Sequence, residues 1–248
     1  MPLAVPETTP AFKAYPQFNN VESEAIVSSR TSVDPSSLLR HFKTDSPPDQ
    51  IARAQGERRA TSIKELIESF EFFQQTRKYV HSSHLIDLCC GHGLTGMLFA
   101  ALDREVERVT LVDARQPGSH SAMLDALGEV APWTRDKIEY FELDTKRWQN
   151  LSTEEGCTTI GVHACGELTD KCLEFAVDRN LSTAVMPCCY PHGRCPAPLS
   201  VQQALGPEQA FDVDRTYRLE SAGYTVRWRY IPPTITPMNR ILIGKRPV

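Results

Sequence analysis

A glycine-rich segment constrains this chain more than any other part of its sequence. Residues 84–100, HLIDLCCGHGLTGMLFA, are typical of a buried strand, a tight turn and a helix. A second apolar run, RVTLVDA, follows at residues 108–114. The turn carries three glycines with G-x-G-x-x-G spacing, which are Gly91, Gly93 and Gly96. Because such glycines let the backbone approach a nucleotide-like ligand, this order of elements predicts a ligand pocket at the edge of a parallel sheet.

Two carboxylates indicate which ligand the pocket takes. Asp87 precedes the first glycine, inside the end of the predicted strand, where it would repel the pyrophosphate of a dinucleotide. S-adenosylmethionine (SAM) carries a sulfonium and an ammonium but no phosphate, so the same carboxylate attracts it. Asp113 ends the next strand and can accept hydrogen bonds from both ribose hydroxyls. The sequence therefore favours SAM over a dinucleotide, with a purely structural glycine turn as the remaining alternative.

The composition is that of one globular α/β domain with an extension. The chain has 248 residues, 41% of them hydrophobic, and a formal net charge of -4, which excludes a wholly basic nucleic-acid binder. Basic residues outnumber acidic ones over residues 211–248, so a local basic face and an ordinary solvated surface are both open. No stretch approaches the ~20 apolar residues that span a bilayer. With no export signal, the eight cysteines are predicted to be reduced thiols of a cytoplasmic protein.

The chain divides into an arm and a domain. Residues 1–60 contain recurrent prolines, serines and threonines with little apolar periodicity, which predicts a largely irregular N-terminal arm. Residues 61–248 are predicted to form the ligand-binding domain. Ser62 and Glu65 form a capping box, and the apolar residues that follow recur on one face of a helix. The polar face of this helix, which includes Glu68, is expected to face solvent or to line the mouth of the pocket.

Strands and helices alternate through the domain. The predicted strands are residues 84–89, 108–113, 138–143, 158–164 and 182–188. The predicted helices are residues 94–103, 119–130, 169–179 and 212–222, with a loop at 190–200 and a closing hairpin at 224–231 and 240–246. This order predicts a doubly wound α/β fold with a seven-stranded sheet, mostly parallel with a C-terminal antiparallel hairpin, as in the Rossmann-like class I methyltransferases.

Ligands of open parallel sheets bind at the carboxyl ends of the strands, and polar residues gather there in this sequence. The predicted cofactor-binding residues are Asp87, Cys89, Gly91, Gly93, Asp113, Asp144 and His163. Asp144 suits the exocyclic amine of adenine, although it can also be a turn residue. His163 and Cys165 are predicted to face the methyl donor, with His163 as a proton acceptor. The alternative is a structural turn in which Thr169 caps the following helix.

The segment MPCCYPHGRC, residues 186–195, supports three interpretations. A metal site would use Cys188, Cys189, His192 and Cys195. Adjacent cysteines rarely both bind one ion and no second C-x-x-C pair is present, so no metal is predicted. A thiolate of this segment would otherwise attack a pyrimidine ring and prepare it for carbon methylation. The favoured interpretation is a lining of the substrate pocket, with Tyr190 stacking on a base or capping the methyl donor.

Four segments occur in a fixed order: IDLCCGHGLTG, VHACGELTD, VMPCCYPHGRC and ITPMNRILIG. Their combination, over residues 62–248, resembles a family of small class I methyltransferase domains (methyltransferase domain 31). That family includes the catalytic domain of the eukaryotic tRNA 2′-O-methyltransferase that acts on the acceptor stem. The resemblance implies SAM contacts near Asp87, Gly91, Gly93 and Asp113. It implies substrate-side or catalytic roles near His163, Cys165, Asp170, Cys188, Cys189 and Tyr190.

The sequence as a whole predicts a SAM-dependent methyltransferase that positions an acceptor against the methyl group of its cofactor. RNA is the favoured acceptor, and a protein side chain or a small molecule is the alternative. A SAM-binding interaction protein without turnover also stays open. No membrane association is predicted, and the sequence does not indicate an oligomeric state.

Overall fold

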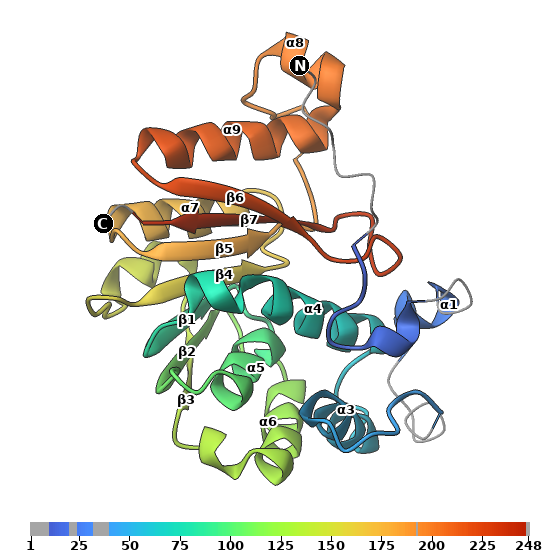
Figure 1. Cartoon of the computed structure of the whole chain (residues 1–248). Helices are drawn as coiled ribbons and strands as arrows, with labels where there is room; N and C mark the ends of the chain where they lie inside the picture. The colour runs from blue at the N-terminus through green and yellow to red at the C-terminus, as the bar shows by residue number, and fades with distance from the viewer. Residues whose placement is uncertain (1–9, 20–23, 32–39, 192, 247–248) are drawn as a thin grey trace.

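The computed structural model describes residues 10–19, 24–31, 40–191 and 193–246 (Figure 1). Its strands are β1 (His84–Leu88), β2 (Arg108–Asp113), β3 (Ile138–Glu142), β4 (Thr158–Val162), β5 (Ser182–Met186), β6 (Thr225–Tyr230) and β7 (Arg240–Lys245). They form one sheet in the order β3-β2-β1-β4-β5-β7-β6. The strands β1 to β5 pair in parallel, whereas β7 runs antiparallel to β5 and forms a hairpin with β6. The predicted seven-stranded fold is confirmed.

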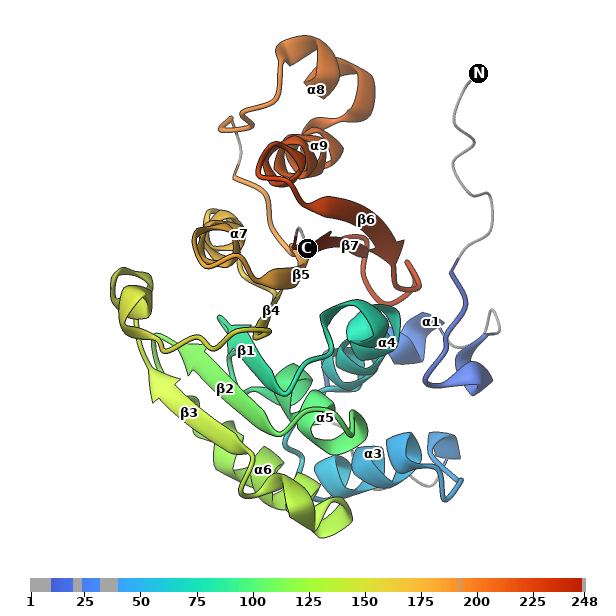
Figure 2. The ribbon, with the colours of Figure 1, turned by 60° about the vertical axis from the view of Figure 1, so that its left-hand side comes forward.

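Helices cover both faces of the sheet. The α-helices are α1 (Glu24–Val27), α3 (Pro47–Glu57), α4 (Ile63–Val80), α5 (Leu94–Leu102), α6 (Ser119–Val130), α7 (Leu168–Asp178), α8 (Leu199–Leu205) and α9 (Pro207–Ser221). Short 3-10 helices are η1 (Pro16–Phe18), η3 (Pro132–Thr134) and η4 (Thr145–Asn150). Figure 2 shows α4, α5 and α6 on one face and α7 and α9 on the other. The central strands β1, β4 and β5 are buried along their whole length, as expected for parallel strands covered on both faces.

The helix α4 is the central element of one face. It begins after Ser62, whose side chain accepts a hydrogen bond from the Glu65 amide, so the predicted cap is present. Apolar side chains of α4 belong to one cluster with those of β4, β5 and β7. The helix therefore covers the half of the sheet that holds β4, β5 and β7, and this position matters for the site.

The N-terminal residues differ from the loose arm that their composition predicts. Residues 47–57 form α3, because Ser46 caps the helix and the two prolines stand in its first turn, where a missing N–H costs nothing. Tyr15 and Phe42 are buried, and their rings lie 5.2 Å apart. The carboxylate of Glu71 on α4 accepts hydrogen bonds from the amides of residues 13 and 14. The described part of the arm is therefore packed on the domain, whereas its separation as a unit stays a prediction.

Three other local expectations need correction. The strands β4 and β5 each end two residues earlier than predicted, and the backbone turns at His163, whose φ is 60°. Residues 199–205, partly within the predicted loop, form α8. The helix α9 begins at Pro207 rather than at residue 212, because a proline in the first turn starts a helix well. Among the described residues, no helix is long and apolar enough to cross a membrane.

Candidate functional site

A cavity of about 540 Å³ opens at the carboxyl ends of β1, β2, β3 and β4. This volume lies in the range of small-molecule pockets. Six of the predicted cofactor-binding residues line it: Asp87, Cys89, Gly91, Asp113, Asp144 and His163. The sheet edge therefore brings together side chains from four different strand ends, as the parallel topology predicts.

Asp87 lies at the bottom of this cavity with an incomplete set of partners. Its side chain is buried, and one carboxylate oxygen, Oδ2, accepts a hydrogen bond of 2.9 Å from the Gly96 amide. The other oxygen, Oδ1, is buried and has no partner among the described residues. Burial, followed by the nearby charge of Asp113, raises the pKa of Asp87 to about 7, although the Gly96 amide opposes this shift. A buried carboxylate with an unpaired oxygen fits a cationic ligand such as SAM.

The turn after β1 requires glycine at position 93. Gly93 has a φ of 88° and caps α5, and a Cβ atom there would lie 2.5 Å from Cδ1 of Leu111. The turn is held by two further contacts. The Gly91 amide donates to Oδ2 of Asp113 at 2.9 Å, and the Tyr140 hydroxyl donates to the Gly91 carbonyl at 2.6 Å. Asp113 therefore shapes the turn in addition to lining the cavity.

Asp144 caps a short helix and also lines the cavity. Its side chain accepts a hydrogen bond of 3.0 Å from the Lys146 amide and so caps η4. The same residue lines the cavity beside Leu143 and Thr145. The structure thus supports the turn-residue interpretation, while contact with the adenine amine stays a prediction.

His163 forms a partly buried polar contact across the sheet edge. Its Nε2 lies 2.8 Å from Oε2 of Glu68 on α4, and the same oxygen lies 2.7 Å from Nζ of Lys64. The Glu68 side chain is only 1% exposed, whereas that of His163 is 35% exposed and lines the cavity. In the tautomer with the proton on Nε2, this N–H donates to Glu68, and Nδ1 is left with a lone pair that can accept a proton.

A second histidine–carboxylate pair lies at the same cavity. His92 contacts Glu65 through its Nε2, and both residues line the pocket. Burial opposes ionisation of Glu65, but the hydrogen bond and charge of His92 prevail and lower its pKa. The Glu65 carboxylate is thus turned toward His92 instead of closing the capping box that the sequence predicts. Only the spacing of the glycine turn could have pointed to His92 as a site residue.

The predicted substrate-side cysteines lie close together. Cys165 follows β4 and lines the cavity, and its Sγ lies 3.0 Å from Sγ of Cys188, which follows β5. The Sγ of Cys189 lies 3.6 Å from that of Cys188. Burial, followed by the neighbouring thiols, raises the pKa of Cys188 well above its usual range. Since the thiolate is the nucleophile, this environment gives little support to attack on a pyrimidine ring.

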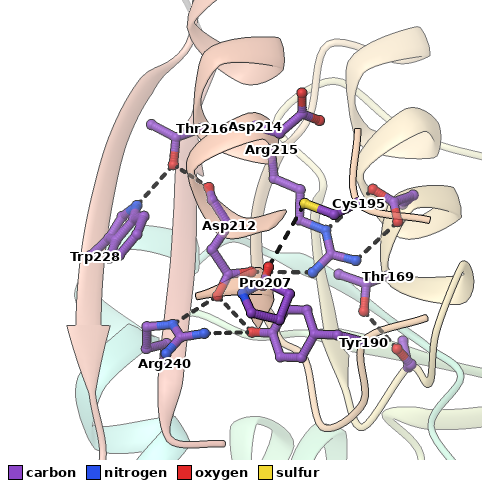
Figure 3. Close-up of polar contacts among 12 residues, drawn as sticks. Thr169, Tyr190, Cys195, Pro207, Asp212, Asp214, Arg215, Thr216, Trp228 and Arg240 are labelled. Atoms are coloured by element: carbon purple, nitrogen blue, oxygen red, sulfur yellow. Dashed lines mark hydrogen bonds and ion pairs between the residues drawn. The ribbon is translucent and has the colours of Figure 1, made fainter. Parts of the chain in front are cut away.

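Asp170 and Tyr190 belong to an ion-pair network instead of the cavity lining. Figure 3 shows Tyr190 beside Asp212 and Arg240. Nη2 of Arg215 on α9 lies 2.9 Å from Oδ2 of Asp170. The Tyr190 hydroxyl donates to Oδ2 of Asp212 at 2.6 Å, and Nε of Arg240 donates to the same oxygen at 2.8 Å. The network ties the loop after β5 to α9 and β7. The predicted substrate contacts of Asp170 and Tyr190 stay predictions, and their described contacts are structural.

The structure also bears on the predicted helix cap at Thr169 and on the two outer residues of the candidate metal site. Thr169 is not the helix cap, because α7 begins at Leu168 and the Thr169 hydroxyl donates to the Ala164 carbonyl at 2.6 Å. Cys195, one of the ligands considered for a metal, has its Sγ 3.8 Å from the Pro207 carbonyl (Figure 3). His192, the other distant ligand of that set, lies outside the described residues.

Comparisons with solved structures give distant similarities. The chain is similar to the Methanococcus jannaschii fibrillarin pre-rRNA processing protein, with 13% identity and a TM-score of 0.47 over 66% of each chain, just under two thirds of that protein. A SAM-dependent methyltransferase from Aquifex aeolicus has 15% identity and a TM-score of 0.45, over 82% of this chain and 98% of that one. A Streptococcus mutans protein in complex with SAH has 12% identity and a TM-score of 0.45, over 73% and 96%. The comparison with curated proteins finds no match.

The strand order and the pocket at the ends of β1 and β2 are those of the class I SAM-dependent methyltransferases. The pattern of the methyltransferase domain family (methyltransferase domain 32) matches residues 57–193, more than half of the chain, which therefore belongs to this family. The matching family is therefore methyltransferase domain 32, whereas the four sequence segments resemble methyltransferase domain 31. The protein is a methyltransferase that uses SAM as its cofactor. The narrower relation to the tRNA 2′-O-methyltransferase stays a prediction.

Proposed function

We propose that this enzyme transfers the methyl group of SAM to an acceptor that reaches the cavity from the ends of β4 and β5, with RNA as the favoured acceptor. The observation that carries the proposal is the contact between His163 and Glu68, 2.8 Å long, at the wall of the cofactor cavity. A histidine oriented by a buried carboxylate is suited to accept a proton from a hydroxyl. The chemistry that SAM supplies when bound is a methyl group activated by its positive sulfur.

The residues of the two halves of the cavity have different proposed tasks. Asp87 and Asp113 bind the cofactor through its positive charge and its ribose. Asp144 lies beside the adenine position. His163 accepts the proton that leaves the acceptor, and Glu68 holds its ring in the productive tautomer. Most of the rate then comes from the position of the acceptor in a site shielded from water.

RNA as the acceptor is supported by the resemblance of the four sequence segments. The local excess of basic residues near the C-terminus gives weaker support than its count suggests. Arg215 and Arg240 are paired with Asp212, and Arg218 contacts Asp170. These cations are already neutralised by carboxylates, so they do not form a free basic face. The proposed RNA therefore depends mainly on shape and base contacts near the cavity.

The acceptor class is tested by incubating the protein with tritiated SAM and fractionated cell extract. Label in RNA that is removed by ribonuclease supports the proposal. Label confined to protein or to small metabolites contradicts RNA as the acceptor but leaves methyl transfer intact. Tight SAM binding without transfer to any fraction contradicts turnover itself and favours an interaction protein.

The role of the histidine is tested with Glu68→Gln and His163→Asn on the labelled acceptor. We expect each variant to lower kcat by about 10²-fold or more and to leave the affinity for SAM within a few-fold of the original, because general-base catalysis contributes about this much. Glu105→Gln is the matched control, since Glu105 contacts the exposed His81 with Oε2 and Nδ1 3.2 Å apart, outside the cavity. Full kcat in both test variants would remove the proposed base.

A further inference from the structure

The topology brings together three thiols that are distant in the sequence. The parallel strands β4 and β5 are paired so that Val162 lies opposite Met186, the last residue of each strand. Both chains therefore leave the sheet at the same edge, with Cys165 three residues beyond β4 and Cys188 two residues beyond β5. The Sγ atoms of Cys165, Cys188 and Cys189 all lie within 4.8 Å of one another.

These thiols are accessible to solvent, and one of them also lines the cofactor cavity. Cys165 and Cys189 are exposed and Cys188 is half-buried. Cys165 also lines the cavity. In the described ranges, no other set of three or more histidine, cysteine or acidic side chains has its ligand atoms gathered in this way.

We propose that Cys165, Cys188 and Cys189 bind a thiophilic divalent cation, with zinc as the ion, through three thiolates beside the cofactor cavity. A zinc–sulfur bond of about 2.3 Å places tetrahedral sulfur ligands about 3.8 Å apart. The Sγ separations of 3.0 Å and 3.6 Å and the limit of 4.8 Å bracket that value. Small side-chain rotations are therefore enough to receive the ion.

The structure removes the two objections that the sequence raises against a metal. Side chains of adjacent residues diverge in a strand, but β5 ends at Met186, and the loop lets the thiols of Cys188 and Cys189 turn to one side. The missing ligand does not come from a second C-x-x-C pair, since Cys165 in the loop after the neighbouring strand β4 supplies it. Because Cys165 lies 23 positions before Cys188, a motif search over residues 186–195 overlooks this third ligand.

Three thiolates leave one position of a tetrahedral zinc ion for water or for a group of the acceptor. Binding exchanges three thiol protons for one divalent ion, so no electrons are transferred and the three protons are released to solvent. The ion joins the loop after β4, which carries His163, to the loop after β5. It thereby sets the distance between the proposed base and the acceptor side of the cavity.

The test measures the metal content of the full chain after purification under reducing conditions. Elemental mass spectrometry gives the equivalents of zinc per protein. We expect close to one equivalent of zinc in the original protein and less than a fifth of that in Cys165→Ser and Cys189→Ser. The matched control is Cys157→Ser. Cys157 lies before β4, at the opposite edge of the sheet, so this variant should keep its zinc. Thermal unfolding and SAM binding of each variant show whether it is folded.

Reconstitution provides the second measurement. The reduced, metal-free protein is titrated with cobalt, and thiolate-to-cobalt absorption in the near ultraviolet is recorded, which we expect in the original protein and the Cys157 variant only. The proposal is overturned by substoichiometric zinc together with no such absorption. It is also overturned by an intact mass lower by two hydrogens with two thiols lost, which would indicate a disulfide instead. Neither measurement requires methyl transfer. The zinc proposal can therefore be contradicted while the proposed function is still supported.

Discussion

The charge of Asp87 should be coupled to the binding of SAM. In the free protein burial raises its pKa to about 7, so the carboxyl is about half protonated near neutral pH. A bound cation favours the ionised form and lowers that pKa, and binding therefore releases a proton. The affinity for SAM should consequently rise with pH through about 7 and level off above it.

The magnitude follows from the two protonation states. With a free pKa of about 7 and a bound pKa near the ordinary value of about 4, the carboxyl is about 90% ionised at pH 8 and about 10% at pH 6. The dissociation constant of SAM should then be about tenfold larger at pH 6, equivalent to about 1.4 kcal/mol. At pH 7 the release should be about half a proton per SAM.

Calorimetry in buffers of different ionisation enthalpy measures both quantities. Asp87→Asn should bind SAM more weakly at pH 8 and should lose the additional proton release. Asp136→Asn is the matched control, because Asp136 is exposed and does not line the cavity. Since the ammonium group of SAM titrates with every variant, only the difference between variants counts. An identical slope of log Kd against pH in Asp87→Asn would refute the reasoning.

Three further changes give distinct expected outcomes. Gly93→Ala should lower both Tm and SAM affinity, because its Cβ would meet Leu111 at 2.5 Å with φ at 88°; unchanged binding by calorimetry would contradict this account of the turn. Asp113→Ala should weaken SAM binding at least tenfold, about 1.4 kcal/mol, and an unchanged Kd would remove the ribose assignment. Asp212→Ala should lower the free energy of unfolding by about 3–5 kcal/mol in denaturant titrations, because it leaves the buried Arg215 and the half-buried Arg240 short of a counter-charge. A loss below about 1 kcal/mol would show that the network is not strongly coupled.

The regular part of the fold was predictable because its signals are local. The bounds of β2 and α6 agree with the predicted ranges 108–113 and 119–130, where a short apolar run and helical periodicity are clear. The sequence does not predict the helix α3 because its two prolines are typical helix breakers, although a capped helix tolerates them in its first turn. The few aromatic anchors of the arm have no periodicity, so their packing depends on tertiary contacts.

The cofactor half of the site was predictable for the same reason. Asp87 and the glycine turn lie in one contiguous segment, and Asp113 ends the strand paired directly beside it. The acceptor half could not be predicted residue by residue. Glu68 is separated from His163 by 95 positions, and Cys165 from Cys188 by 23. Each of these contacts depends on strand order and on how α4 crosses the sheet, neither of which is written in the local sequence.

The position of α4 joins the two halves of the cavity. Glu65 at its start contacts His92 in the glycine turn, and Glu68 one turn later contacts His163 beyond β4. Residues three or four apart lie on the same face of a helix, so one rigid face presents both carboxylates to the two histidines. A rotation or shift of α4 would move both contacts together, because a helix packed in the core does not bend to move one alone. The spacing between the cofactor turn and the proposed base therefore depends on a helix that precedes every strand of the sheet.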